Sequence, residues 1–101
     1  MKIKNIAFIG LGNMGYYMAS HLVDKKYTII PHDINKNNLK SFYNNTKIKE
    51  INFLESIEKV DCVILMVPSS KEVNEIIFKK NKIFQKLKKN TIIIDMSTSI
   101  P

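Results

Sequence analysis

The 101-residue chain contains only three glycines, and they stand in the spacing G-x-G-x-x-G at Gly10, Gly12 and Gly15. Glycine has no Cβ, so such a turn can be tight and its backbone can approach a phosphate closely. The spacing alone is weak evidence, because glycines occur in many turns. Here an apolar run at residues 6–9 leads into the glycines and a helical pattern follows, which is the context of a dinucleotide site. We therefore predict that these glycines, with the N–H groups around Asn13 and Met14, bind a pyrophosphate.

A carboxylate stands where such a site needs one, because Asp33 follows Gly15 by 18 residues. An acid at the end of the second strand accepts hydrogen bonds from the ribose hydroxyls and repels a 2′-phosphate, which favours NAD over NADP. A helix N-cap or an Asx-turn is the alternative role for Asp33, and both roles can coexist. Lys36 lies close enough in sequence to turn toward a 2′-phosphate, so NADP stays open as the second choice of cofactor.

The elements that must position these residues alternate along the chain. Apolar, β-branched runs predict buried parallel strands at residues 4–10, 27–33, 62–68 and 91–97. The short segment at residues 46–51 is predicted to be an edge strand. This order predicts one domain over residues 1–101 with a doubly wound parallel α/β sheet, the Rossmann fold, in strand order 3-2-1-4-5.

Helices are predicted from apolar residues at helical spacing between the strands. The stripes are Met14, Met18 and Leu22; Leu39, Phe42 and Tyr43; Val73, Ile76 and Ile77; and Ile83, Phe84 and Leu87, with a short helix at residues 52–59. Pro31 opposes this scheme, because a proline in a flanked strand cannot donate its ladder hydrogen bond. We expect the second strand to be bent or shortened near its end.

Three further residues stand at the carboxyl ends of the predicted fourth and fifth strands. Val67 and Pro68 end one strand and Ser97 ends the other. The carboxyl ends of strands form the edge at which open α/β sheets bind ligands, so these residues are candidates for the same site. The alternative is a strand-ending proline and a capping Ser-Thr pair.

Composition narrows the possible partners. The net charge is +7, but all 16 basic residues are lysines, scattered along the chain, and arginine is the side chain that pairs best with bases and phosphates. A nucleic-acid partner is therefore not expected. Cys62 lies alone in an apolar run, which favours a buried thiol in a reducing compartment. No apolar run reaches the length of a membrane span, and no signal peptide precedes the first strand, so we expect a soluble, cytoplasmic protein without a membrane partner.

The phrases "FIGLGNMG", "ILMVPSS" and "IDMSTSIP" together resemble the β-hydroxyacid dehydrogenase family along the whole chain. The resemblance implies hydride transfer between a short β-hydroxyacid and NAD(P). It adds Leu11 to the pyrophosphate turn, assigns Asp33 to the ribose, and places Val67 and Pro68 beside the nicotinamide. It also implies that Thr98 contacts the cofactor and that Ser97 helps to hold the substrate carboxylate.

The chain departs from the family pattern at two positions. Glu72 stands where the family tends to carry an asparagine, and Ile100 stands where an aspartate or serine is usual. Family members continue into a helical domain that supplies the catalytic lysine and an oligomer interface. We therefore expect no catalytic residue and no metal ligand in this chain, and no turnover by it alone. The alternative is a module that binds a dinucleotide, or a partner, without catalysis.

Overall fold

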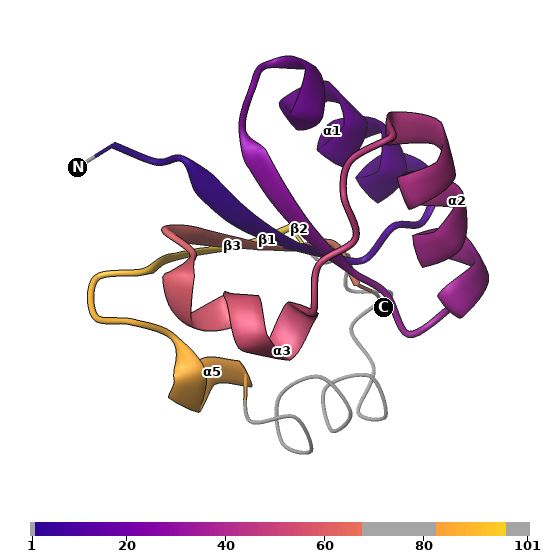
Figure 1. Cartoon of the computed structure of the whole chain (residues 1–101). Coiled ribbons are helices and arrows are strands. Elements are labelled where there is room, and N and C mark those ends of the chain that lie inside the picture. Colours follow the sequence, from indigo (N-terminus) through magenta and orange to yellow (C-terminus); the bar gives the residue numbers. More distant parts are fainter. Residues whose placement is uncertain (1, 68–82, 97–101) are drawn as a thin grey trace.

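The computed structural model describes residues 2–67 and 83–96. In this part of the chain, four parallel strands form one sheet in the order β2-β1-β3-β4, with helices on both faces (Figure 1). The strands are β1 (Asn5–Ile9), β2 (Thr28–His32), β3 (Cys62–Leu65) and β4 (Ile92–Asp95). The helices are α1 (Asn13–Asp24), α2 (Lys36–Thr46), α3 (Phe53–Ser56), the 3-10 helix η1 (Ile57–Lys59) and α5 (Ile83–Lys86). The predicted parallel α/β class is confirmed.

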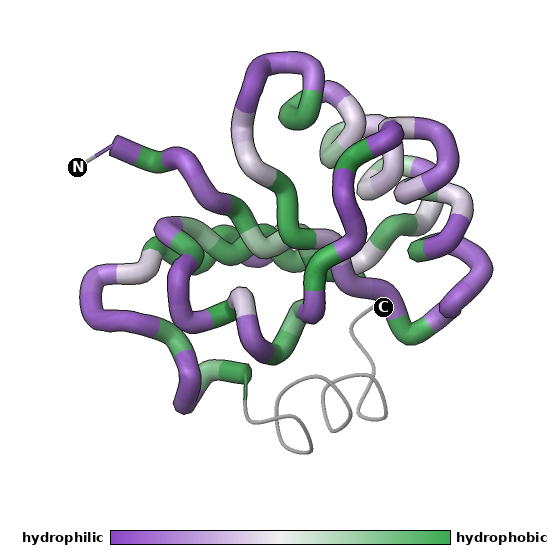
Figure 2. The backbone as a smooth tube through the Cα atoms, viewed as in Figure 1, coloured by the Kyte–Doolittle hydropathy of each residue, from purple (hydrophilic) through white to green (hydrophobic). Residues whose placement is uncertain are grey.

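Two apolar clusters, one on each face of the sheet, hold the helices in place. Side chains alternate along β1, so Ile6 and Phe8 join a cluster that includes Phe42 of α2, whereas Ala7 and Ile9 join one built with α3, η1 and α5. Figure 2 shows the hydrophobic stretches gathered in the central strands and the hydrophilic stretches in the outer turns. Helices thus flank the sheet on both sides, as a doubly wound fold requires.

The predicted strand order 3-2-1-4-5 is not confirmed, because the edge strand expected at residues 46–51 is absent from the described part of the chain. The four strands found correspond to the predicted first, second, fourth and fifth. Local contacts hold the segment instead: Lys47 ends α2 in the left-handed conformation (φ 62°) and donates its N–H to the Tyr43 carbonyl. Ile48 packs on the core beside α2, and the Ile51 N–H donates to the Tyr43 hydroxyl at 3.3 Å. Burial of Ile48 therefore accounts for the apolar pattern without a strand.

Pro31 does not shorten β2, contrary to the expectation from sequence, because pairing continues through it to His32. The Thr28 N–H donates to the Lys4 carbonyl and the His32 carbonyl accepts from the Gly10 N–H, both at 2.9 Å. Successive residues of a parallel strand turn toward opposite neighbours, so residues 28, 30 and 32 face β1 and the Pro31 nitrogen faces the outer edge. The proline breaks no ladder bond, and it withholds the donor that a strand outside β2 would use.

Burial differs from the sequence prediction at β4 and at the start of α1. The strand at β4 was expected to be buried, but its isoleucines are 41–46% exposed, whereas those of β2, at the other edge of the described sheet, are 2–4% exposed. Met14 was expected on the buried stripe of α1, yet it is 70% exposed, while Gly15 and Ala19 form the buried face. The stripe at Val73, Ile76 and Ile77 lies outside the described residues.

At the amino end of the sheet, Asp61, which precedes β3, joins neighbouring segments through its side chain. Its Oδ2 accepts the N–H groups of Lys4 and Asn5, both at 2.9 Å, and its Oδ1 pairs with Lys88 Nζ at 2.8 Å. The Asn5 N–H, then the Lys88 and Lys4 donors, hold the pKa of this carboxyl well below its usual value. Asp61 thus links β1 and β3 to the segment that leads into β4.

Candidate functional site

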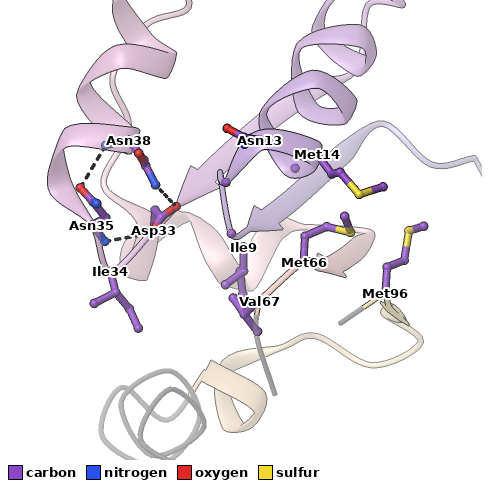
Figure 3. Close-up of a pocket in the computed structure, with 13 residues that line it drawn as sticks. Ile9, Asn13, Met14, Asp33, Ile34, Asn35, Asn38, Met66, Val67 and Met96 are labelled. Carbon is purple, nitrogen blue, oxygen red and sulfur yellow. Dashed lines mark hydrogen bonds between the residues drawn. The ribbon is translucent and has the colours of Figure 1, made fainter. Parts of the chain in front are cut away.

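A cleft of about 720 Å³ opens at the carboxyl ends of β1, β2 and β3 (Figure 3). Of the predicted site residues it brings together Gly10, Gly12, Asn13, Met14, Gly15, Asp33 and Val67. Its remaining lining residues were not singled out from the sequence: Ile9, Ile34, Asn35, Asn38, Met66 and Met96. Leu11 is only 2% exposed and does not line this cleft, although its N–H bonds to Asp33. Pro68, Ser97 and Thr98 lie outside the described residues.

The three glycines of the turn meet different surroundings. Gly10 has a φ of +104°, and a Cβ there would collide with the backbone carbonyl of Met66. A Cβ on Gly15 would collide with the Gly10 carbonyl, so this glycine permits close packing of α1 against the turn. A Cβ on Gly12 would meet nothing within 4 Å. The fold therefore requires Gly10 and Gly15, whereas the missing side chain of Gly12 only leaves space in the cleft.

The N-terminus of α1 supplies hydrogen-bond donors to this space. The helix begins at Asn13 after Gly12, and no side chain caps it. Its first acceptor is the Gly12 carbonyl, which receives the Tyr16 N–H at 2.7 Å, so the N–H groups of the preceding residues have no partner within the helix. Free N–H groups and the helix dipole together favour a bound anion. At Gly12 no Cβ stands in the way of a ligand that approaches these N–H groups.

Asp33 faces the cleft from the end of β2 and is held by three donors. Its Oδ2 accepts the Leu11 N–H at 2.7 Å and the Asn38 side-chain amide at 3.3 Å, and its Oδ1 accepts the Asn35 N–H at 2.8 Å. The bond to Asn35 is the Asx-turn foreseen as the alternative role, but the N-cap of α2 is Asn35 and not Asp33. Asp33 therefore shapes the turn between β2 and α2, fastens the glycine turn to it, and still lines the cleft.

The two histidines do not line the cleft. His21 is exposed on α1. The His32 ring stacks on Phe53 with its centroid 4.5 Å away, and burial lowers the pKa of the imidazole although neighbouring Asp33 raises it. Asp33 is thus the single titratable side chain among the described residues that line the cleft. The described residues also contain no cluster suited to a metal ion, and none of their helices is long and apolar enough to cross a membrane.

Comparison with known proteins places these features in a family. Residues 5–101 match the family described as the NAD binding domain of 6-phosphogluconate dehydrogenase. The mitochondrial 3-hydroxyisobutyrate dehydrogenase of Mus musculus is 38% identical over 96 residues, which cover 95% of this chain and 29% of that protein.

Two solved structures are similar to the chain. The Mycobacterium tuberculosis 3-hydroxyisobutyrate dehydrogenase with L-serine has a TM-score of 0.78 and 27% identity over 97% of this chain and 33% of that one. A semialdehyde dehydrogenase NAD-binding protein from Cupriavidus necator, in complex with calcium and NAD, has a TM-score of 0.69 and 26% identity over 94% of this chain and 33% of that one. The chain spans about a third of the length of the relatives it matches.

Proposed function

The chain belongs to the family of NAD binding domains of 6-phosphogluconate dehydrogenase, and we propose that it binds NAD in the cleft at the carboxyl ends of β1, β2 and β3. One observation carries the proposal: Gly12, whose Cβ position is open, lines one cleft together with the N-terminus of α1 and the Asp33 carboxylate. A dinucleotide needs these two groups next to each other, because it carries a pyrophosphate beside a ribose diol.

Each part of the cofactor then has a partner in this chain. The turn formed by Gly10, Leu11, Gly12, Asn13, Met14 and Gly15 binds the pyrophosphate. Asp33 accepts from the adenosine ribose, which favours NAD over NADP. Val67 and Pro68 flank the nicotinamide, Thr98 contacts the cofactor, and Ser97 holds the substrate carboxylate, as the family resemblance implies.

We propose that the whole protein transfers hydride between a short β-hydroxyacid and NAD. The cofactor supplies the hydride chemistry, and this chain positions it. The described cleft contains no group free for acid–base work, because its one titratable side chain, Asp33, is held by three donors. The acid–base lysine is therefore assigned to the helical part of the family, together with the contacts for an oligomer. The chain alone should show no turnover with NAD and 3-hydroxyisobutyrate.

The same absence of an acid–base group supports a second candidate, a dinucleotide-binding module without catalysis. One activity assay distinguishes the two candidate functions. The chain joined to a lysine-bearing helical domain from a relative reduces NAD with a β-hydroxyacid if it is the cofactor half of an enzyme. A module without catalysis binds NAD equally well and stays inactive in that fusion.

For the compartment we propose the cytoplasm, on the evidence of one cysteine. Cys62 is a buried, free thiol, as is typical of a reducing compartment, and burial raises its pKa. The mouse relative is named as mitochondrial. Imaging of a fluorescently tagged protein distinguishes the two locations.

Titration calorimetry with NADH tests cofactor binding. Gly12→Val should weaken binding at least about 100-fold and leave the melting temperature nearly unchanged, because the new side chain enters the cleft and touches no protein atom within 4 Å at its Cβ. Gly10→Val is the contrasting variant, and it should not fold, because its Cβ meets the Met66 carbonyl. Normal NADH binding by Gly12→Val would contradict the proposal.

A further inference from the structure

The Asp33 carboxylate has little capacity left for a ribose. A carboxylate offers about four lone-pair positions, and three are taken by Leu11, Asn35 and Asn38. The free position is on Oδ1, which has one partner, whereas Oδ2 has two. An adenosine ribose presents two hydroxyl groups, at its 2′ and 3′ carbons. Asp33 alone therefore accounts for one of them.

We propose that Asn38 is a specificity-determining residue, which takes the second ribose hydroxyl and disfavours a 2′-phosphate; this inference rests on the proposed binding of NAD in the cleft. Asn38 lines the cleft and points its amide at Asp33 (Figure 3). An amide has two N–H groups and an acceptor oxygen, and only one N–H is used on Asp33. This leaves one N–H and the oxygen of the Asn38 amide for a ligand beside the Asp33 carboxylate.

The backbone around Asn38 keeps this amide in place. The Asn38 N–H donates to the Asn35 side-chain oxygen at 3.3 Å in the first turn of α2, and the side chain is half-buried. The other two donors to Asp33 are backbone N–H groups of Leu11 and Asn35, which the fold holds in position. Asn38 is thus the one side chain that adjusts the hydrogen bonding of Asp33 at this site.

Asn38 also separates the cleft from a second hollow. This hollow of about 420 Å³ lies between α1 and α2 and shares Gly12, Asn13 and Asn38 with the cleft. None of the described residues that line either space is a lysine. A 2′-phosphate at the Asp33–Asn38 pair would meet a carboxylate and a neutral amide, and Lys36, the cation next to them in sequence, does not line the cleft. The Asp33–Asn38 pair therefore distinguishes the two cofactors at the 2′ position of the adenosine ribose. Asp33 repels a 2′-phosphate, and Asn38 binds a 2′-hydroxyl.

Calorimetry with NADH, NADPH and ADP-ribose on the purified protein tests this role. In Asn38→Ala we expect the Kd of NADH and of ADP-ribose to rise about fivefold, the effect of one hydrogen bond, while the Kd of NADPH changes less than twofold. The preference for NADH over NADPH then falls about fivefold. Asn38→Leu keeps the volume of the side chain without its polar atoms and should behave in the same way.

Asn37→Ala is the matched control, because Asn37 is exposed in the same turn of α2 and only its backbone N–H bonds to Asn35. Alanine is a better helix former than asparagine, so melting temperatures should not fall in either alanine variant. If the wild-type protein binds NADH and Asn38→Ala matches Asn37→Ala, the role of Asn38 is overturned and the proposed function stands. A loss for NADH that ADP-ribose does not share, or full affinity in Asn38→Leu, also overturns it. A wild-type protein that does not bind NADH overturns both.

Discussion

Two aspartates at opposite ends of the sheet, Asp33 and Asp61, each accept three hydrogen bonds, but their partners differ in kind. Asp61 binds two backbone N–H groups and forms an ion pair with the Lys88 ammonium at 2.8 Å. Asp33 binds two backbone N–H groups and the neutral amide of Asn38. A lysine of the chain pairs with the first carboxylate, whereas the second lines a cleft and has only neutral donors as its hydrogen-bond partners.

This difference separates a structural carboxylate from one suited to a ligand. The oxygens of Asp61 are engaged by a lysine and two backbone N–H groups of the same chain, so this carboxylate serves the fold. A carboxylate with only neutral donors remains a strong acceptor for hydroxyl groups. Three hydrogen bonds to Asp61 therefore stabilise the amino end of the sheet. Three hydrogen bonds to Asp33 position a carboxylate that can bind a ligand at the carboxyl end.

When the two aspartates are compared, the largest expected effect is on the Kd of NADH. Asp33→Ala should raise the Kd of NADH about 30-fold, because the ribose loses a charged acceptor and the Leu11 N–H loses its partner. Asp61→Ala should leave that Kd within about twofold of wild type, since Asp61 does not line the cleft. Calorimetry on both variants measures the contrast, and an equal effect would end the distinction between the two carboxylates.

The stability of the fold, in contrast to NADH binding, should depend more on Asp61 than on Asp33. Asp61→Ala leaves the Lys4 and Asn5 N–H groups and Lys88 without their acceptor, so we expect the melting temperature to fall by about 5 °C. Circular dichroism melts at pH 7 provide the measurement. An unchanged melting temperature would show that water replaces the carboxylate without cost.

The pH dependence of stability sharpens this role. The pKa of Asp61 is lower in the folded protein than its unfolded value near 4, so the carboxylate contributes stability that is fully present above about pH 4. That contribution declines as the pH falls from about 4 toward the lower folded pKa, because protonation breaks the bonds to Lys88 and the backbone. Wild-type melting temperatures should therefore drop more steeply below pH 4 than those of Asp61→Asn. Parallel curves would assign the acid sensitivity to other groups.

The smallest effect is expected from the lysine alone. The Lys88 side chain is 45% exposed, and an ion pair that faces solvent contributes little. Lys88→Ala should lower the melting temperature by only about 1 °C, and the difference should shrink further in 0.5 M salt because of screening. A drop as large as that of Asp61→Ala would mean that the ion pair, and not the backbone bonds, holds this end of the sheet.

Sequence patterns predicted the strands and the glycine turn because both depend on local features. The apolar runs lie at β1, β2, β3 and β4, and the glycines stand where the turn needs them. The prediction of an edge strand at residues 46–51 was wrong, because an apolar pattern indicates that a side chain is buried but not that its backbone pairs with a strand. Ile48 is half-buried against α2 without joining the sheet. Likewise, Met14 fits the spacing of a buried stripe but lies at the first turn of α1, where the helix faces the cleft.

The site residues that sequence reasoning missed depend on contacts between elements. Asparagines at the start of a helix are typical of caps, and Asn35 is one. Only the fold shows that Asn38, one turn further, bonds to Asp33 and lines the cleft. The pattern D-x-N-x-x-N from Asp33 to Asn38 was the available signal, because it places a second amide three residues after the cap, on the same face of the helix as the cap residue.

A titration of ¹⁵N-labelled protein with NADH, followed by amide chemical shifts, tests the central claim most directly. The account predicts the largest shifts at the N–H groups of residues 11–15 and 33–38, which surround the cleft. It predicts no shift at Lys4, Asn5 and Asp61, at the other end of the sheet. Shifts centred on the amino end, or none at the glycine turn at saturating NADH, would contradict it.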